Sequence, residues 1–113
     1  MKKIEAIIRP EVFAAVREGL AEVGIDGLSI SEIAGCGRQE GRQALFRGNS
    51  YTMEFSPKLK LETIVDTEKV QSIVDVILRE ACTGQVGDGK IFIYPVEQAI
   101  RIRTKEIGSV AVD

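Results

Sequence analysis

Polar and apolar residues alternate along residues 3–8, Lys-Ile-Glu-Ala-Ile-Ile, and several of the apolar ones are β-branched. This pattern predicts a strand that is buried mainly on one face. Pro10 ends the strand and suits the first position of a helix, and Gly24 suits a helix C-cap. Between them, apolar and small residues recur at helical spacing, so we expect an amphipathic helix. Its inward positions are Val12, Ala15, Val16, Gly19, Leu20 and Val23.

The rest of the chain shows three more strand-like runs and one more helical one. Residues 28–33 predict a second strand, and the alternating residues 58–65 predict a third. An apolar stripe over 70–81 predicts a second helix, which Asp66-Thr67 can cap. Residues 90–95 then predict a fourth strand, and Arg101–Thr104 a short fifth.

A polar stretch separates the second and third strands. Residues from about 37 to 56 carry few apolar side chains and no sustained period, which predicts a long loop. Loops of this length are uncommon in compact domains and usually have a function. A tolerated surface insertion is the alternative.

The predicted element order is βαββαβ. It is typical of the ferredoxin-like α+β fold, in which both helices cover one face of a four-stranded antiparallel sheet. A chain of 113 residues closes one core, so residues 1–113 are expected to form a single domain. The other sheet face would be uncovered, and its apolar residues would need a partner surface, which suggests oligomerisation.

Composition narrows the classes of function. A net charge of −2 disfavours binding to nucleic acid. No apolar run approaches the roughly 20 residues that span a bilayer, so direct membrane insertion is not expected. The start of the chain, Met-Lys-Lys-Ile-Glu-Ala, is unlike a signal peptide, which predicts a cytoplasmic protein.

The chain has no histidine, which removes the usual general base and the Ser-His and Cys-His nucleophile pairs. No carboxylate or lysine pair stands out by its spacing, so an enzyme is not expected. Cys36 and Cys82 are too few for a disulfide framework and too isolated for a zinc site. The sequence assigns them no role.

A glycine-rich segment joins the second helix to the fourth strand. Residues 83–93 read Thr-Gly-Gln-Val-Gly-Asp-Gly-Lys-Ile-Phe-Ile, with three glycines in six positions followed by Lys90. Exposed backbone N–H groups beside a lysine favour phosphate binding. The segment is no Walker A loop, because Ile91 replaces the Ser or Thr and a helix precedes it. A ligand-free turn is the alternative if the segment is taken alone.

Several segments together resemble one family. These are the glycine segment, the Gly37-Arg38-Gln39 step, Tyr51 in the long loop, Pro95-Val-Glu97 and the Arg-Ile-Arg-Thr run from Arg101. With the βαββαβ order they resemble the PII nitrogen-regulatory signal-transduction proteins over essentially the whole chain.

The resemblance implies a homotrimer whose clefts between subunits bind ATP or ADP. A phosphate loop at about 82–90 would receive the phosphates, and the tail 101–113 would reach the nucleotide from the adjacent subunit. If Arg101 and Arg103 lie two apart on a strand, they share one face, where guanidinium groups suit polyphosphate. Ser29, which replaces the usual threonine, matches a position around the adenine, as do Ile7, Glu62 and Ile64. The residues that match the nucleotide site are Ile7, Ser29, Gly35, Gly37, Arg38, Gln39, Glu62, Ile64, Gly87, Asp88, Gly89, Lys90, Arg101 and Arg103.

The resemblance also implies a second ligand, 2-oxoglutarate, bound beside Mg-ATP. Gln39 matches the residue that joins the Mg²⁺ shell, which agrees with the oxygen ligands that Mg²⁺ prefers. The residue after it is usually lysine and here is Glu40, so we expect weakened or altered effector binding. The residues that match the 2-oxoglutarate site are Arg9, Gln39, Gly41, Lys58 and Gly87.

Tyr51 matches the tyrosine that is uridylylated in many bacterial members. Its flanking residues, Phe46-Arg-Gly-Asn-Ser, differ from the usual pattern, and an unmodified loop tyrosine is the alternative.

The resemblance implies a sensor that regulates an ammonium transporter or a nitrogen-metabolism enzyme or regulator. The ligands would set the arrangement of the long loop, and the transporter would recruit the protein to the membrane. Two alternatives stay open. One is a small enzyme that uses the nucleotide cleft, and the other is a nucleotide-free structural or metal-tolerance trimer of the same fold.

Overall fold

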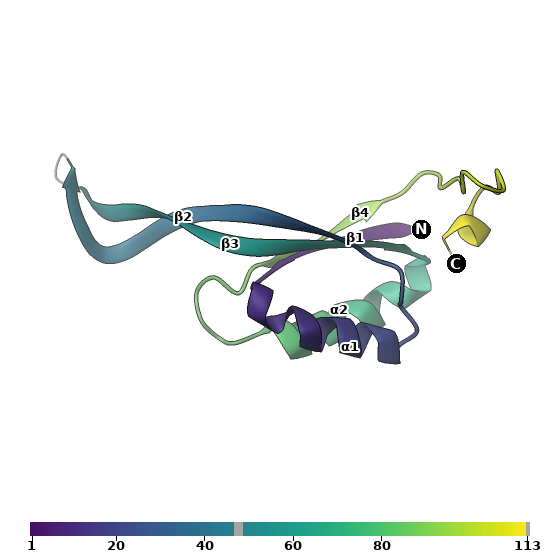
Figure 1. Cartoon of the computed structure of the whole chain (residues 1–113), viewed down its shortest axis with the longest axis horizontal. Coiled ribbons are helices and arrows are strands. Elements are labelled where there is room, and N and C mark those ends of the chain that lie inside the picture. Colours follow the sequence, from purple (N-terminus) through teal and green to yellow (C-terminus); the bar gives the residue numbers. More distant parts are fainter. Residues whose placement is uncertain (47–48, 113) are drawn as a thin grey trace.

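A computed structural model of the chain shows two helices packed on one face of an antiparallel sheet (Figure 1). It describes the backbone of residues 1–46 and 49–112, and the side chains of residues 1–35 and 55–112. Three short 3-10 turns accompany the main elements. In chain order the elements are β1 (Lys2–Ile8), η1 (Pro10–Val12), α1 (Phe13–Glu22), β2 (Ser29–Phe46), β3 (Asn49–Val65), η2 (Thr67–Lys69), α2 (Val70–Ala81), β4 (Lys90–Pro95) and η3 (Ser109–Ala111).

The sheet has the strand order β2-β3-β1-β4, with antiparallel neighbours throughout. β1 lies in the middle, where Ile7 pairs with Lys60 of β3 and with Lys90 of β4. At the other end of β1, Lys3 pairs with Ile64. The predicted ferredoxin-like fold is confirmed.

The core lies between the sheet and the helices. Ile4, Ala6 and Ile8 of β1 are buried, and they alternate with residues of the open face. Both helices contribute buried residues at helical spacing, as predicted, but Ala15 and Val23, which were predicted to face inward, are exposed. Within the described residues, none of the helices is long and apolar enough to cross a membrane. The other core residues include Val16, Leu20, Leu61, Ile73, Val76 and Ile77.

The helix ends follow the predicted signals in part. Pro10 opens the turn that leads into α1, and Gly24 follows α1 in the left-handed region at φ 85°. Asp66 takes the N-cap position before η2, but its side chain makes no capping hydrogen bond, so the predicted cap is wrong in its chemistry. The turn is instead closed by the main chain, because the Lys69 N–H donates to the Asp66 carbonyl at 3.0 Å.

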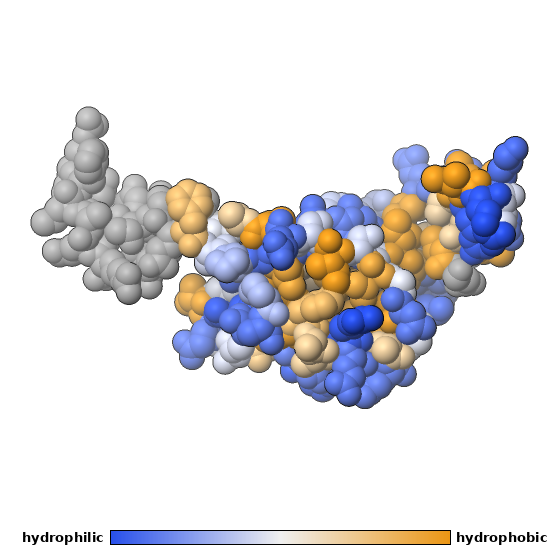
Figure 2. Space-filling view, viewed as in Figure 1, coloured by the Kyte–Doolittle hydropathy of each residue, from blue (hydrophilic) through white to orange (hydrophobic). Residues whose placement is uncertain are grey.

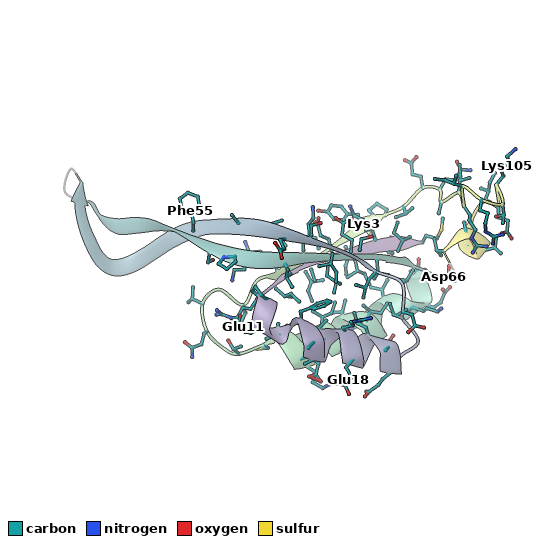
Figure 3. The ribbon with its side chains drawn as sticks, viewed as in Figure 1. Lys3, Glu11, Glu18, Phe55, Asp66 and Lys105 are labelled. Atoms are coloured by element: carbon teal, nitrogen blue, oxygen red, sulfur yellow. The ribbon has the colours of Figure 1, made fainter. Side chains whose placement is uncertain are left out.

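The long loop predicted at about 37–56 is wrong in its structure, because the described backbone there is paired as strands. β2 and β3 continue into it as one long hairpin, with a register shift between Glu40 and Leu45. The hairpin lengthens the molecule to 58 Å (Figure 1). Phe55 stands at its base with 79% of its surface exposed, pointing away from the helices (Figure 3). Ladder hydrogen bonds join main-chain groups, which is why a polar sequence without period still forms strands.

The predicted fifth strand is absent from the described chain, and that prediction is wrong. Residues 102–104 form a turn, and a single bridge joins Ile100 to Ile107. Arg101 and Arg103 therefore do not share a strand face. The chain turns here because the Lys105 N–H donates to the Arg101 carbonyl at 2.7 Å, and Lys105 itself has a positive φ of 63°.

Charged groups occupy much of the open sheet face, where Lys3 lies (Figure 3). Lys60 stands 3.7 Å from a Glu5 oxygen and 3.4 Å from a Glu62 oxygen, and Lys3 lies 3.8 Å from Glu62. The Tyr94 hydroxyl donates to Glu5 at 2.7 Å, and this bond raises the pKa of Tyr94. The open face is thus less apolar than the sequence suggested.

Apolar side chains remain exposed on the sheet and the tail. Figure 2 shows them beside the charged residues over the sheet and again at the tail. Ile64 and Phe92 on the open face are 37% and 40% exposed. Contact with another protein surface would bury them.

Candidate functional site

The loop between α2 and β4 is organised by one carboxylate. The backbone N–H groups of Thr83 and Gly84 donate to Asp88 at 2.8 and 2.9 Å. The Thr83 hydroxyl also donates to Asp88. These bonds, led by the one from the Thr83 side chain, hold the pKa of Asp88 far below its usual range. The Asp88 carboxylate therefore closes the loop itself, which leaves glycine N–H groups and Lys90 as its donors for an anion.

Gly89 fixes this loop to the sheet. Its φ is 100°, and a Cβ built on it would lie 1.7 Å from the carbonyl oxygen of Ile7. Only glycine allows both the left-handed backbone and this approach. Gly84 and Gly87 also have positive φ, so all three glycines of the loop share that backbone region.

Two cations meet beside Gly87. The Arg9 guanidinium donates to the Val86 carbonyl at 2.8 Å and to Asp88 at 3.2 Å, and the Lys58 ammonium donates to the Gly87 carbonyl. A Cβ on Gly87 would lie 3.2 Å from Arg9 Nη2 and 3.5 Å from Lys58 Nζ. The two charges come from the end of β1 and from β3, so the fold itself brings them to one place.

Gly35 makes room for Lys58. A Cβ on Gly35 would stand 3.1 Å from the Lys58 Cγ, tighter than an ordinary contact. The structure therefore brings together Arg9, Lys58 and Gly87 of the predicted 2-oxoglutarate set, with Gly35 beside them. The side chains of Arg9 and Lys58 thus place two positive charges beside the main chain of Gly87, where a carboxylate could approach them.

Lys90 opens β4 beside Ile7, its partner in the ladder. Both line a pocket of about 410 Å³, along with Asp88, Gly89 and Cys82. The remaining wall comes from apolar residues of β1, α2 and β4. Cys82 is an exposed free thiol.

A second group of predicted residues lies near the start of β2. Ser29 pairs with Glu62, and both line a pocket of about 300 Å³ with Ile64. Beside them the buried Thr63 donates its hydroxyl to the Gly27 carbonyl at 3.0 Å, which ties the chain before β2 to β3. Three of the four residues that the resemblance places around the adenine, Ser29, Glu62 and Ile64, are therefore neighbours, whereas the fourth, Ile7, lines the other pocket.

The tail holds Arg101 in a structural role. Its guanidinium donates to Glu106 and to the Val110 carbonyl, each at 2.8 Å. Arg103, in the turn, makes no hydrogen bond or ion pair with the described part of the chain. The resemblance implies one role for both arginines, whereas in the structure Arg101 is bonded within the tail and Arg103 lies in the turn. Glu106 was missed because its role depends on the fold of the tail.

The predicted nucleotide residues whose side chains are described form two groups along the sheet. Ile7, Gly35 and Gly87–Lys90 lie at the end where the glycine loop leaves α2, and Ser29, Glu62 and Ile64 lie toward the tail (Figure 1). Along β3, Glu62 and Ile64 lie two and four residues from Lys60, the ladder partner of Ile7, or about 7 and 13 Å. The glycine loop and the residues toward the tail line different pockets of this chain.

The hairpin residues Gly37, Arg38, Gln39, Gly41 and Tyr51 lie outside the residues whose side chains are described, as do Glu40 and Cys36. Their predicted roles in nucleotide, Mg²⁺ and 2-oxoglutarate binding and in modification stay predictions.

Curated proteins similar to this chain carry one description. A protein of Nostoc punctiforme described as nitrogen regulatory protein P-II is 53% identical over 112 residues, covering 99% of this chain and all of the relative. Nitrogen regulatory protein P-II 1 of Escherichia coli is 50% identical with the same coverage.

Two solved structures share the fold. GlnK of B. subtilis superposes with a TM-score of 0.83 at 34% identity, covering 97% of this chain and 96% of that one. Arabidopsis thaliana PII, bound to citrate, has a TM-score of 0.78 at 35% identity, covering 99% and 89%. The sequence model of the family described as Nitrogen regulatory protein P-II matches residues 1–106. The chain belongs to the P-II family of nitrogen regulatory proteins.

Proposed function

We propose that the protein is a trimeric regulator without enzymatic activity that senses nucleotide and 2-oxoglutarate. ATP or ADP binds in clefts between neighbouring subunits. With Mg-ATP in place, 2-oxoglutarate binds beside the phosphates, and the hairpin of β2 and β3 then docks on or releases a target protein. The target is an ammonium transporter, or an enzyme or regulator of nitrogen metabolism, and a transporter would bring the cytoplasmic protein to the membrane.

The observation that carries this proposal is the meeting of Arg9 and Lys58 at Gly87. In the chain as described, both cations bind loop carbonyls, so a dicarboxylate would replace carbonyl partners with charged ones and gain stronger hydrogen bonds. Citrate, bound to the Arabidopsis relative, also carries carboxylates.

The division of the nucleotide residues supports clefts between subunits. The glycine loop of one subunit would hold the phosphates, and Arg103 of a neighbour would reach them. Mg²⁺ would enter with ATP, and Gln39 is the residue proposed to join its shell, where it supplies an amide oxygen. Because Gln39 belongs to the hairpin, ligand binding would favour one hairpin arrangement over another.

Titration calorimetry of 2-oxoglutarate into the protein with saturating Mg-ATP tests this function. We expect Lys58→Ala to weaken 2-oxoglutarate binding about tenfold or more, since one of two charge-assisted bonds is lost. Affinity for ATP alone should change little. Arg79→Ala, which removes an exposed cation of α2, should behave like the wild type.

Two results would count against the proposal. One is an unchanged 2-oxoglutarate affinity in Lys58→Ala, and the other is a wild type that binds neither ATP nor ADP.

The same titration on Glu40→Lys measures how the glutamate at position 40, where the family usually has lysine, affects the affinity for 2-oxoglutarate. We expect it to bind 2-oxoglutarate more tightly than the wild type, and equal affinities would reject a role for Glu40.

The target protein and the modification of Tyr51 need separate assays. A pull-down from native lysate, with and without ATP plus 2-oxoglutarate, should recover a nitrogen-metabolism protein or transporter in a ligand-dependent way. Uridylylation of Tyr51 by a bacterial uridylyltransferase would add mass to the wild type and none to Tyr51→Phe.

A further inference from the structure

Val112 of the tail contributes to the walls of two adjoining pockets. One is the pocket of about 300 Å³ that contains Ser29, Glu62 and Ile64, and the other has a volume of about 620 Å³. They share Gly27, Thr63, Ile64 and Val112. Volumes of this size are typical of small-molecule sites.

The chemistry of the smaller pocket suits a flat heteroaromatic group with a polar edge. Ile64 and Val112 supply aliphatic surface, whereas Ser29 and Glu62 supply a hydroxyl and a carboxylate. In the described chain the pairing of β2 with β3 ends at Ser29 and Glu62, so residues 63–65 pair with β1 alone. Their main-chain groups on the other side can hydrogen-bond a ligand.

The tail places Val112 by a chain of hydrogen bonds. The Val112 N–H donates to Ser109 at 3.1 Å within the turn η3. Arg101 holds that turn through the Val110 carbonyl at 2.8 Å and is itself oriented by Glu106, also at 2.8 Å. Thr104 donates to the same Glu106 oxygen at 2.6 Å, which fixes the carboxylate.

We infer that Val112 is a nucleobase-binding residue, one apolar wall of the pocket for the adenine ring, and that Arg101 is the positioning residue that holds it there. This inference rests on the proposed nucleotide function. The tail of a subunit then has two roles. It carries Arg103 to the cleft, and its turn η3 shapes the nucleobase pocket of its own chain.

The test compares two valines. Val112→Ala removes two methyl groups from the pocket wall and should weaken ATP binding about fivefold in calorimetry. Val23→Ala makes the same change at an exposed position that lines neither pocket, and it should leave the affinity unchanged. In wild-type protein with labelled methyl groups, nuclear Overhauser contacts should join adenine ring protons to Val112.

Arg101 is tested through its partner. Glu106→Ala should weaken the Val112–adenine Overhauser contacts and lower ATP affinity about threefold, while the midpoint of thermal unfolding of the ligand-free protein shifts little. A change in fold alone would not move the Overhauser contacts of one residue selectively.

The outcomes separate the two proposals. A wild type that binds no nucleotide overturns the proposed function and this inference with it. A wild type that binds ATP normally, with no Val112–adenine contacts and no loss in Val112→Ala, overturns the inference alone.

Discussion

Gly84 and Gly89 share a backbone conformation but differ in their surroundings. Their φ angles are 83° and 100°, a region in which side chains add strain. Around Gly84 a Cβ would meet nothing within 4 Å, whereas on Gly89 it would overlap the Ile7 carbonyl at 1.7 Å. Alanine substitutions at these two positions therefore distinguish the cost of backbone strain from the cost of steric overlap.

We expect Gly84→Ala to lower the free energy of unfolding by about 1 kcal/mol, the cost of the left-handed backbone alone. Gly89→Ala should lower it by about 3 kcal/mol or more, because β1 and the loop must also move apart. Urea denaturation of both variants measures the difference. Equal losses would show that the close approach to Ile7 contributes nothing.

The glycine loop behaves as one element because Asp88 accepts several bonds at once. Folding lowers the pKa of Asp88, mainly through the Thr83 side chain. For an acid with a lowered folded pKa, the stabilisation is present above its unfolded value, about 3.9, and is lost as pH falls toward the folded value. The loop should thus keep its hydrogen bonds at every physiological pH.

Amide chemical shifts of Thr83 and Gly84 followed against pH test this element. In the wild type they should stay constant down to about pH 4 and change only below it. In Thr83→Val, which keeps the shape but loses the hydroxyl, the change should begin at higher pH. A wild-type transition centred at or above about pH 4 would contradict the proposed bonding.

A helix or strand could be predicted from the sequence where the spacing of its apolar residues matches the positions of its buried residues. β1 shows this, since its buried residues alternate as the pattern predicts. α2 follows its predicted stripe at Ile73, Ile77 and Ala81, but Val76, outside that stripe, is buried, and Leu78, within it, is exposed. The hairpin could not be predicted as strand, because its pairing uses main-chain groups that any polar sequence carries. Arg101–Thr104 alternates like a strand, but without a neighbouring strand it folds into a turn.

The candidate site was partly predictable for a similar reason. Gly89 and Lys90 stand out in the sequence as part of a glycine-rich run followed by a lysine, whereas Lys58 was predicted only through the resemblance. Glu106 and Val112 act by where the tail places them, and a lone glutamate or valine carries no such signal. Asp88 was predicted in the right loop, but its partners Thr83 and Gly84 emerge only from the folded geometry.

At the scale of the whole molecule, the two parts of the proposed nucleotide site lie toward different ends of the sheet. The phosphate loop with Lys90 is at one end, and the tail with Arg103 is at the other (Figure 1). In the proposed trimer, the loop end of each subunit would meet the tail end of the next, so every cleft would take Lys90 and Arg103 from different chains. The open sheet face, with Ile64 and Phe92, would be covered in the same assembly.

Mixed oligomers test this arrangement. Lys90→Ala and Arg103→Ala homo-oligomers should each lose most ATP affinity, because every cleft lacks one phosphate contact. After the two variants are unfolded and refolded together, each mixed trimer should contain one intact cleft, formed by Lys90 of one chain and Arg103 of another. Calorimetry should then recover a fraction of sites with wild-type affinity.

The matched control mixes Lys90→Ala with the double variant Lys90→Ala/Arg103→Ala. That mixture has no chain with Lys90, so no cleft is complete and no high-affinity sites should return. If the first mixture also recovers none, although native mass spectrometry shows mixed trimers, Lys90 and Arg103 do not act from different chains. Recovery in the first mixture alone would establish that the nucleotide site exists only between subunits.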